Sequence, residues 1–299
     1  MIFLQKLAQT LLIAIGLQIP GNFSDFSQTH QNFLWLIETP TNRVYLLGSI
    51  HLLSEEDYPL SQPIQDAFED AENVVFEIDL GVPEKEVADV LLDRALPDNE
   101  DELLQTALDP ETYALVEELS VEFDLPLTFF DDFEPWFFSM NLEVARLLDS
   151  GLGLSPKYGI DNYLFQQAID SDKEIIALET FTEQIDILDS LSTEAQQNLI
   201  ESTIAETQTV TTLFNEIRAA WRIGDSASME DLLLSDLTSY PELYDVLIIE
   251  RNQNWLAKIE TMLNQTEEDY LIVVGALHMI GDMGLIQQLQ VMGYAPEQL

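Results

Sequence analysis

Two short segments share an arrangement of residues that could bind a metal or activate water. Residues 44–51 read Val-Tyr-Leu-Leu-Gly-Ser-Ile-His and residues 271–278 read Leu-Ile-Val-Val-Gly-Ala-Leu-His, so each is an apolar run that ends in Gly-x-x-His. The chain has three histidines, and His51 and His278 end these two segments. A neutral imidazole is the commonest metal-binding side chain. The repeated setting indicates one site that uses both histidines, with two unrelated structural histidines as the alternative.

Two acids lie in a third apolar run, at residues 73–80. Glu77 and Asp79 are two positions apart, so in a strand both side chains would point to one face. An acid within such a run is costly unless it is paired or bound to a metal. Two histidines and a carboxylate suit zinc, manganese or iron, and the carboxylate could instead act as a base on bound water. Glu77 is embedded more deeply and is favoured; an acid turned to solvent is the alternative.

Three further charged residues are candidates. Glu179 ends the apolar run 173–178 and could be a ligand, a base or a partner that orients a histidine. Asp161 could take part in the same site or cap the helix that follows it. Arg251 is one of eleven basic residues, and its guanidinium could hold a substrate carboxylate or stabilise an oxyanion. A salt bridge to one of the many acids is the alternative for Arg251.

The composition excludes several classes of function. The chain carries 55 acids against 11 bases, a net charge of −44, which argues against nucleic-acid binding because that affinity comes largely from Lys and Arg on phosphates. Anionic membrane surfaces should repel the chain for the same reason. There is no Cys, which excludes disulfides, thiolate zinc sites and cysteine nucleophiles. With 46% hydrophobic residues in patterned runs, a folded domain is expected rather than disorder.

The excess of acids also predicts salt adaptation. Salt screens the repulsion between like charges, which otherwise destabilises the compact state. We therefore expect the melting temperature to rise as salt increases into the molar range, measured by circular dichroism or calorimetry. Equal melting temperatures in low and high salt would contradict this prediction.

The first residues predict a targeting segment. Residues 1–21 begin with one positive charge and continue as a mostly apolar stretch, which resembles an export signal and is short for a membrane span. An uncleaved anchor or a buried first helix is the alternative. We expect a periplasmic or extracellular protein, with membrane contact only through this segment.

The remaining pattern predicts one α/β (α+β) domain over residues 30–299. Apolar runs of strand character are expected at residues 34–38, 43–47, 73–80, 173–178 and 270–274. Helical periodicity is expected at residues 63–71, 162–169, 193–223, 241–263 and 284–292, with a helical insertion at about 83–150. Alternating strands and helices predict a mixed, partly parallel central sheet flanked by helices. Ligands collect at the carboxyl ends of such strands, where the candidate histidines and acids lie.

Short motifs in a fixed order carry a family resemblance. They lie at residues 33–37, 45–51, 74–80, 134–136, 158–161, 177–180 with Gln184, 251–255, and 274–278 with Gly281. In this order and spacing the chain resembles the TraB/PrgY/GumN proteins, from about residue 33 to 294. Ser49 stands where the family more often has Thr, which keeps the hydroxyl.

The resemblance implies a fold and a chemistry. It implies a fold shared with the Tiki proteases and, more distantly, with erythromycin esterases and haem-binding ChaN-like proteins. Tiki proteins are metal-dependent proteases with two Gly-x-x-His motifs and an essential acid. Carried over, His51 and His278 would be the paired histidines and Glu77 the acid. The resemblance also supports the assignment of Arg251, Asp161 and Glu179 to the same site.

We therefore expect an exported metal-dependent hydrolase that cleaves a peptide or protein substrate. His51, His278 and Glu77 would hold manganese, cobalt or zinc. One alternative is a non-catalytic module of the same fold that binds haem, a metal or a peptide. Another is an inactive relative whose helical insertion contacts a partner protein.

Overall fold

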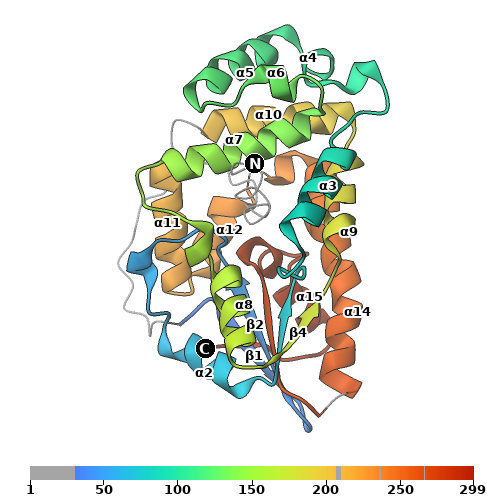
Figure 1. Cartoon of the computed structure of the whole chain (residues 1–299). Helices are drawn as coiled ribbons and strands as arrows, with labels where there is room; N and C mark the ends of the chain where they lie inside the picture. Colours follow the sequence, from blue (N-terminus) through green and yellow to red (C-terminus); the bar gives the residue numbers. More distant parts are fainter. Residues whose placement is uncertain (1–30, 207–209, 236, 266) are drawn as a thin grey trace.

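A mixed six-stranded sheet forms the centre of the computed structural model, which describes residues 31–206, 210–235, 237–265 and 267–299 (Figure 1). The strands are β1 (Leu34–Glu38), β2 (Arg43–Ser49), β3 (Asn73–Phe76), β4 (Glu174–Ala177), β5 (Tyr270–Gly275) and β6 (Glu297–Gln298). Their order is β4-β3-β5-β2-β1-β6. The first four in this order are parallel, while β1 runs antiparallel to β2 and β6. The predicted mixed, partly parallel sheet is confirmed.

The parallel strands consist of the apolar runs seen in the sequence. All six residues of β5 are buried, as are the last six of β2, which is expected for strands covered on both faces. Ser49 of β2 pairs with Gly275 of β5, and Phe76 of β3 pairs with Val273. The carboxyl ends of these strands therefore lie at one edge of the sheet.

The third strand is shorter than the run that predicted it. β3 ends at Phe76, although the Glu179 N–H still donates to the Glu77 carbonyl at 2.8 Å. Beyond this point the chain turns outward, and the exposed Asp79 accepts a hydrogen bond from the Gly81 N–H. Glu77 is 2% exposed. The prediction that both acids share a face was therefore wrong, because residues 77–80 do not continue the strand.

Helices cover the sheet and build a separate layer beyond its carboxyl edge. The helices nearest the sheet are α2 (Gln62–Asp70), α8 (Ile160–Asp170), α9 (Phe181–Asp189), α14 (Glu250–Gln265) and α15 (Leu285–Val291). The segment predicted as an insertion carries α3 (Glu84–Arg94), α4 (Leu104–Ala107), α5 (Pro110–Glu122), α6 (Leu127–Phe130) and α7 (Pro135–Asp149). In Figure 1, α4 to α7 lie with α10 (Thr193–Glu206) at the end of the molecule opposite the β1–β2 turn.

The two long stretches of predicted helical periodicity are helical in the structure. The periodic stretch at 193–223 forms α10 and α11 (Val210–Arg222). The helix α10 packs on α7, whereas α11 packs on α12 (Ser226–Leu233). The two helices of this stretch therefore have different packing partners. The stretch at 241–263 forms α13 (Pro241–Tyr244), a π-helical turn (Asp245–Ile249) and α14. Turns of this kind are frequent at functional sites.

The amino-terminal predictions fall outside the described residues. The expected export segment at residues 1–21 lies there. Among the helices that the structure does describe, none is long and apolar enough to cross a membrane.

A buried acid at the start of α7 gives a stability prediction. Glu134 is 5% exposed and accepts a hydrogen bond from Gln196 Nε2 at 2.6 Å. Burial raises the pKa of Glu134 to about 7. The folded state therefore holds this proton more tightly than the unfolded state, so the free energy of unfolding falls as pH rises toward 7.

Glu134→Gln removes this penalty and keeps the shape of the side chain. We expect the variant to match the wild type near pH 4.5 and to exceed its free energy of unfolding by about 3 kcal/mol above pH 8. Urea unfolding at both pH values measures the difference. A wild-type advantage at the higher pH would contradict the prediction.

Candidate active site

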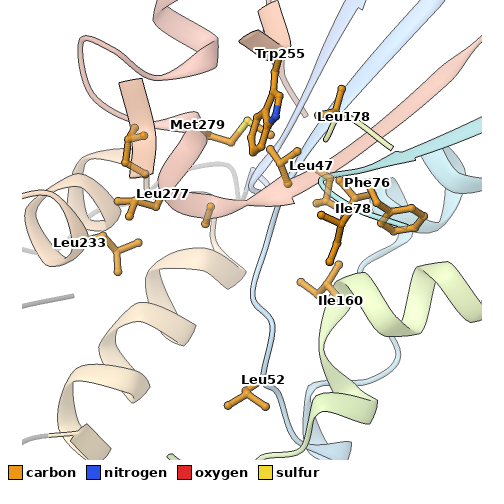
Figure 2. Packing of buried hydrophobic residues seen from close by; sticks show 14 of the residues in the cluster. Leu47, Leu52, Phe76, Ile78, Ile160, Leu178, Leu233, Trp255, Leu277 and Met279 are labelled. Atoms are coloured by element: carbon orange, nitrogen blue, oxygen red, sulfur yellow. The ribbon is translucent and has the colours of Figure 1, made fainter. Parts of the chain in front are cut away.

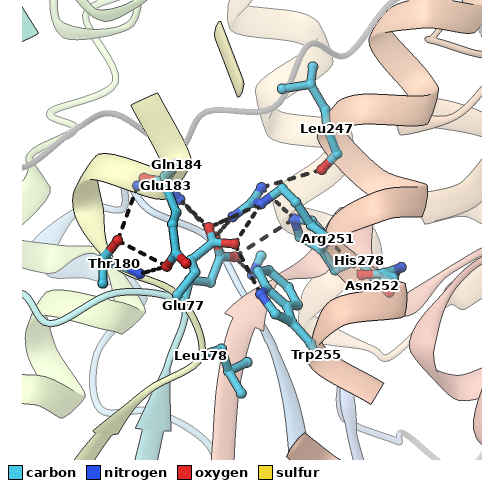
Figure 3. A network of polar contacts seen from close by, with 12 residues as sticks. Glu77, Leu178, Thr180, Glu183, Gln184, Leu247, Arg251, Asn252, Trp255 and His278 are labelled. Atoms are coloured by element: carbon cyan, nitrogen blue, oxygen red, sulfur yellow. Dashed lines mark hydrogen bonds and ion pairs between the residues drawn. The ribbon is translucent and has the colours of Figure 1, made fainter. Parts of the chain in front are cut away.

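The carboxyl edge of the sheet brings the candidate residues together. Ser49 ends β2 with His51 two residues later, Glu77 follows β3, and His278 lies in the 3-10 turn (Ala276–Met279) after β5. Glu179 follows β4 at the same edge. Figure 3 shows Glu77, Gln184, Arg251, Trp255 and His278 as one polar network.

His51 forms a pair with Asp161. His51 Nδ1 lies 2.7 Å from Asp161 Oδ2, and the Ser49 hydroxyl donates to Asp161 Oδ1 at 2.7 Å. Both side chains of the pair are about nine-tenths buried. With Nδ1–H donated to the carboxylate, Nε2 carries the free lone pair. This nitrogen has no partner among the described residues.

A glycine allows this pair to form. Gly159 precedes α8, and the Ile160 N–H donates to the Ile50 carbonyl at 3.0 Å. A Cβ on Gly159 would lie 2.0 Å from the His51 carbonyl oxygen. Only glycine permits this approach of two backbones, which places Asp161 against the imidazole.

Gly275 marks the point where three site residues converge. A Cβ built on it would lie 3.3 Å from His51 Nε2, 3.3 Å from Glu77 Oε1 and 3.7 Å from His278 Cδ2. Its N–H donates to Glu77 Oε1 at 2.6 Å. A side chain here would crowd all three groups, so the glycine of the second Gly-x-x-His segment keeps this point open.

Arg251 forms ion pairs with two acids of the site, Glu77 and Glu179. Its Nη2 donates to Glu77 at 2.5 Å and to Glu179 at 2.6 Å, and its Nε donates to Glu179 at 3.1 Å. Its Nη1 donates to the Leu247 carbonyl at 3.3 Å and to His278 Nε2 at 3.0 Å. A guanidinium has five N–H donors, and these contacts use all five. Arg251 therefore orients the network.

The tautomer of His278 follows from its partners. Asn252 Nδ2 donates to the carbonyl oxygens of His278 and Met283, so Asn252 Oδ1 faces His278 Nδ1 at 2.8 Å. An amide oxygen only accepts, so Nδ1 carries the proton. His278 Nε2 then accepts from Arg251. The ring of Trp255 packs on the imidazole at 4.5 Å, and its Nε1 donates to Glu179.

The surroundings shift the pKa values of the two histidines in opposite directions. Burial would lower the pKa of His51, but the charge and hydrogen bond of Asp161, together with Glu77, raise it above its usual value. Burial, the Arg251 charge and His51 hold the pKa of His278 well below its usual value. Burial also raises the pKa of Glu179, although Arg251 opposes this shift. The site thus holds one neutral imidazole and one that readily takes a proton.

Comparison with known proteins agrees with this geometry. The family model of the TraB/PrgY/gumN family matches residues 33–298. The chain belongs to this family. It is 28% identical over 255 residues to the uncharacterized protein YbaP of Escherichia coli K12. This alignment covers 85% of this chain and 90% of YbaP. YbaP of Shigella flexneri, also uncharacterized, matches to the same extent. No solved structure matches the chain significantly.

Most of the TraB/PrgY/gumN motifs of this chain contribute a residue to the site. His51, Glu77, Asp161, Glu179, Arg251 and His278 all lie there. Asp79 does not, and Glu134 contacts Gln196 instead. The positioning roles of Gln184, Asn252 and Trp255 were not predicted. Trp255 lies four positions after Arg251, which puts both on one helix face; that spacing was the available signal.

The predicted metal ligands are adjacent but do not form a preformed coordination site. Within the described ranges, no group of three or more His, Asp or Glu residues could hold a metal ion as arranged. His51 Nε2 is available, but His278 Nε2 accepts from Arg251 and Glu77 already accepts from Gly275 and Arg251. His278 could bind a metal only after Arg251 released it.

A nuclear magnetic resonance titration tests the assigned protonation. We expect the ring signals of His51 to titrate with a midpoint above the usual pKa of about 6.5. The ring signals of His278 should remain those of a neutral imidazole over the same pH range. His51→Gln and His278→Gln assign the signals. In Asp161→Asn the midpoint of His51 should fall, since the raising charge is lost. A His278 that titrates above His51 would contradict the assignment.

Proposed function

We propose that the chain is a hydrolase that cleaves a peptide or another acyl bond, with His51 as general base. The observation that carries this proposal is the His51–Asp161 pair, whose unpartnered Nε2 lies beside Glu77 and His278 at Gly275. An imidazole with one nitrogen held by a carboxylate and the other free is suited to accept a proton from water.

In this mechanism water gives its proton to His51 Nε2 and its oxygen attacks the substrate carbonyl carbon. Asp161 stabilises the imidazolium that forms, and His51 returns the proton to the leaving group. The oxyanion needs a donor. The contact of Arg251 Nη1 with the neutral Leu247 carbonyl is long, at 3.3 Å. In this mechanism the same N–H would donate to the oxyanion.

A divalent cation is the second form of the proposal. The guanidinium of Arg251 is paired with two carboxylates, those of Glu77 and Glu179, and Asp161 adds a third beside His51. This excess of negative charge favours a cation. Manganese, cobalt or zinc would be held by His51 and Glu77, with His278 joining if Arg251 moved. When bound, such an ion would lower the pKa of a bound water.

A substrate screen with a metal test decides between these forms. Purified protein is treated with a chelator and incubated with a peptide pool and with p-nitrophenyl acetate, then assayed again after addition of manganese, cobalt or zinc. Turnover without added metal supports His51 as the base, and turnover only with metal supports the cation form. If neither substrate class is cleaved under any condition, the hydrolase proposal fails.

We also propose that residues 1–21 direct export. Alkaline phosphatase folds only where disulfides form, so its fusion to this segment reports the compartment. Activity that depends on residues 1–21 supports export, and a fusion protein that is produced but inactive would refute it.

A further inference from the structure

A large apolar cavity opens from the polar site into the helical layer. Its volume is about 200 Å³, which is room for far more than a single water. Its polar end is formed by His51, Glu77, Arg251 and His278. Leu52, Leu233 and Leu277, labelled in Figure 2, belong both to the core and to the wall of this cavity.

The wall of the cavity is mainly apolar and comes from several helices. On α7 the lining residues Trp136, Met140, Val144 and Leu147 recur at helical spacing, so one face of this helix is turned to the cavity. The helices α9, α10, α11 and α12 also contribute to the wall, together with Leu247 and Ile248 of the π-helical turn. A cavity of this composition stabilises an apolar occupant through the area it removes from water.

The polar groups along the wall are mostly satisfied by one another. The hydroxyls of Ser139 and Thr203 lie 2.8 Å apart, and Glu143 is ion-paired with Arg146. Two buried atoms that belong to lining residues have no partner among the described residues: Trp136 Nε1, a donor, and Gln184 Oε1, an acceptor. Buried polar atoms are normally hydrogen-bonded, so these two are available to a polar group of a ligand.

The charge of the polar end selects against anions. The lining carboxylate of Glu77 is paired there with Arg251, which also pairs with Glu179 and has no free donor in this arrangement. A free fatty-acid carboxylate would meet repulsion without a counter-charge. A neutral carbonyl meets no such penalty.

We propose that the cavity holds a long uncharged aliphatic acyl chain, whose ester or amide carbonyl lies at His51. This inference rests on the proposed hydrolase and names its substrate class. The carbon chain fills the apolar wall, and the carbonyl carbon is the atom that water attacks. Water adds to that carbon, the ester or amide bond breaks, and the alcohol or amine leaves with the proton that His51 took. An amide can also donate its N–H, which an ester cannot.

A series of chain lengths tests the substrate class. The substrates are the p-nitrophenyl esters and p-nitroanilides of butanoic, octanoic and dodecanoic acid, used below their micelle concentrations. We expect kcat/KM to rise at least tenfold from butanoate to dodecanoate, because each buried methylene adds affinity. The nitroanilide series separates an amide source from an ester source. Equal kcat/KM across chain lengths would overturn the inference.

Variants locate the effect in the cavity. Ile217 of α11 is partly exposed and lines the cavity, so Ile217→Trp fills part of it, and Leu188→Phe on α9 does the same independently. We expect either variant to lose most of the chain-length dependence, with kcat/KM falling much more for dodecanoate than for butanoate. Ala219→Trp, on the exposed face of α11, is the matched control. Unchanged chain-length dependence in both cavity variants would overturn the inference.

A ligand that cannot be hydrolysed separates this inference from the proposed function. Decan-1-ol is titrated into the full chain by calorimetry. Binding that Ile217→Trp weakens at least fivefold supports the aliphatic cavity even if no ester is cleaved, in which case the hydrolase proposal alone fails. Absence of decan-1-ol binding, together with ester turnover independent of chain length, refutes the cavity inference and leaves the hydrolase intact.

Discussion

Replacing Arg251 by methionine is expected to destabilise the fold by about 3 to 5 kcal/mol, the cost of leaving buried charges without their partner. Arg251 contacts Glu77 and Glu179, and all three side chains are at least nine-tenths buried. Urea unfolding at pH 8 measures the loss. The loss should shrink at low pH, because protonated carboxyls need no counter-charge.

Two further variants show whether charge or packing causes the loss. Arg251→Met combined with Glu179→Gln should recover part of the stability, because one of the two unpaired charges is gone. Arg94→Met is the control, since Arg94 makes only surface ion pairs with Asp93 and Asp186; such pairs contribute little. If Arg251→Met proves as stable as Arg94→Met, the network does not carry the stability we assign to it.

Replacing His51 by glutamine is expected to lower the rate of hydrolysis by about 10²- to 10⁴-fold, the range that a general base contributes. Glutamine can still bond Asp161, so the melting temperature should change little. Asp79→Asn is the matched control, because Asp79 lies outside the site. The assay is the substrate that the screen identifies. A His51→Gln variant that keeps the wild-type rate would refute His51 as the general base.

The pH profile adds a second measure of the His51–Asp161 pair. Asp161 raises the pKa of His51, so the active neutral imidazole should appear only above the usual pKa of histidine. Asp161→Asn should lower the maximal rate and also move the acid limb of the profile to lower pH, because the charge that favours the imidazolium is removed. A limb that stays in place would show that another group controls it.

The relation between sequence and site can be followed at particular residues. His51, Glu77, Glu179 and His278 each follow an apolar run, and parallel strands bring such ends to one edge. Their neighbourhood could therefore be predicted without the strand order. Asp79 was wrongly paired with Glu77 because alternation holds only while the strand continues, and β3 ends at Phe76.

Other features could not be read from local pattern. The short β6 strand pairs with β1 through Trp35 and Gln298, a contact between the two ends of the domain that no periodicity shows. Asn252 orients His278 only because α14 packs beside the turn after β5. Many acids in the chain could have paired with Arg251, and the sequence alone favoured none of them.

The sequence by itself determined the fold class, the family and the set of residues at the carboxyl edge, because apolar periodicity and motif order are local properties of the chain. Only the tertiary structure decided how these residues are connected. It placed Arg251 between Glu77, Glu179 and His278, paired His51 with Asp161, and extended the site into an apolar cavity. These contacts join residues far apart in the chain, so packing decides them, and with them the protonation of each histidine.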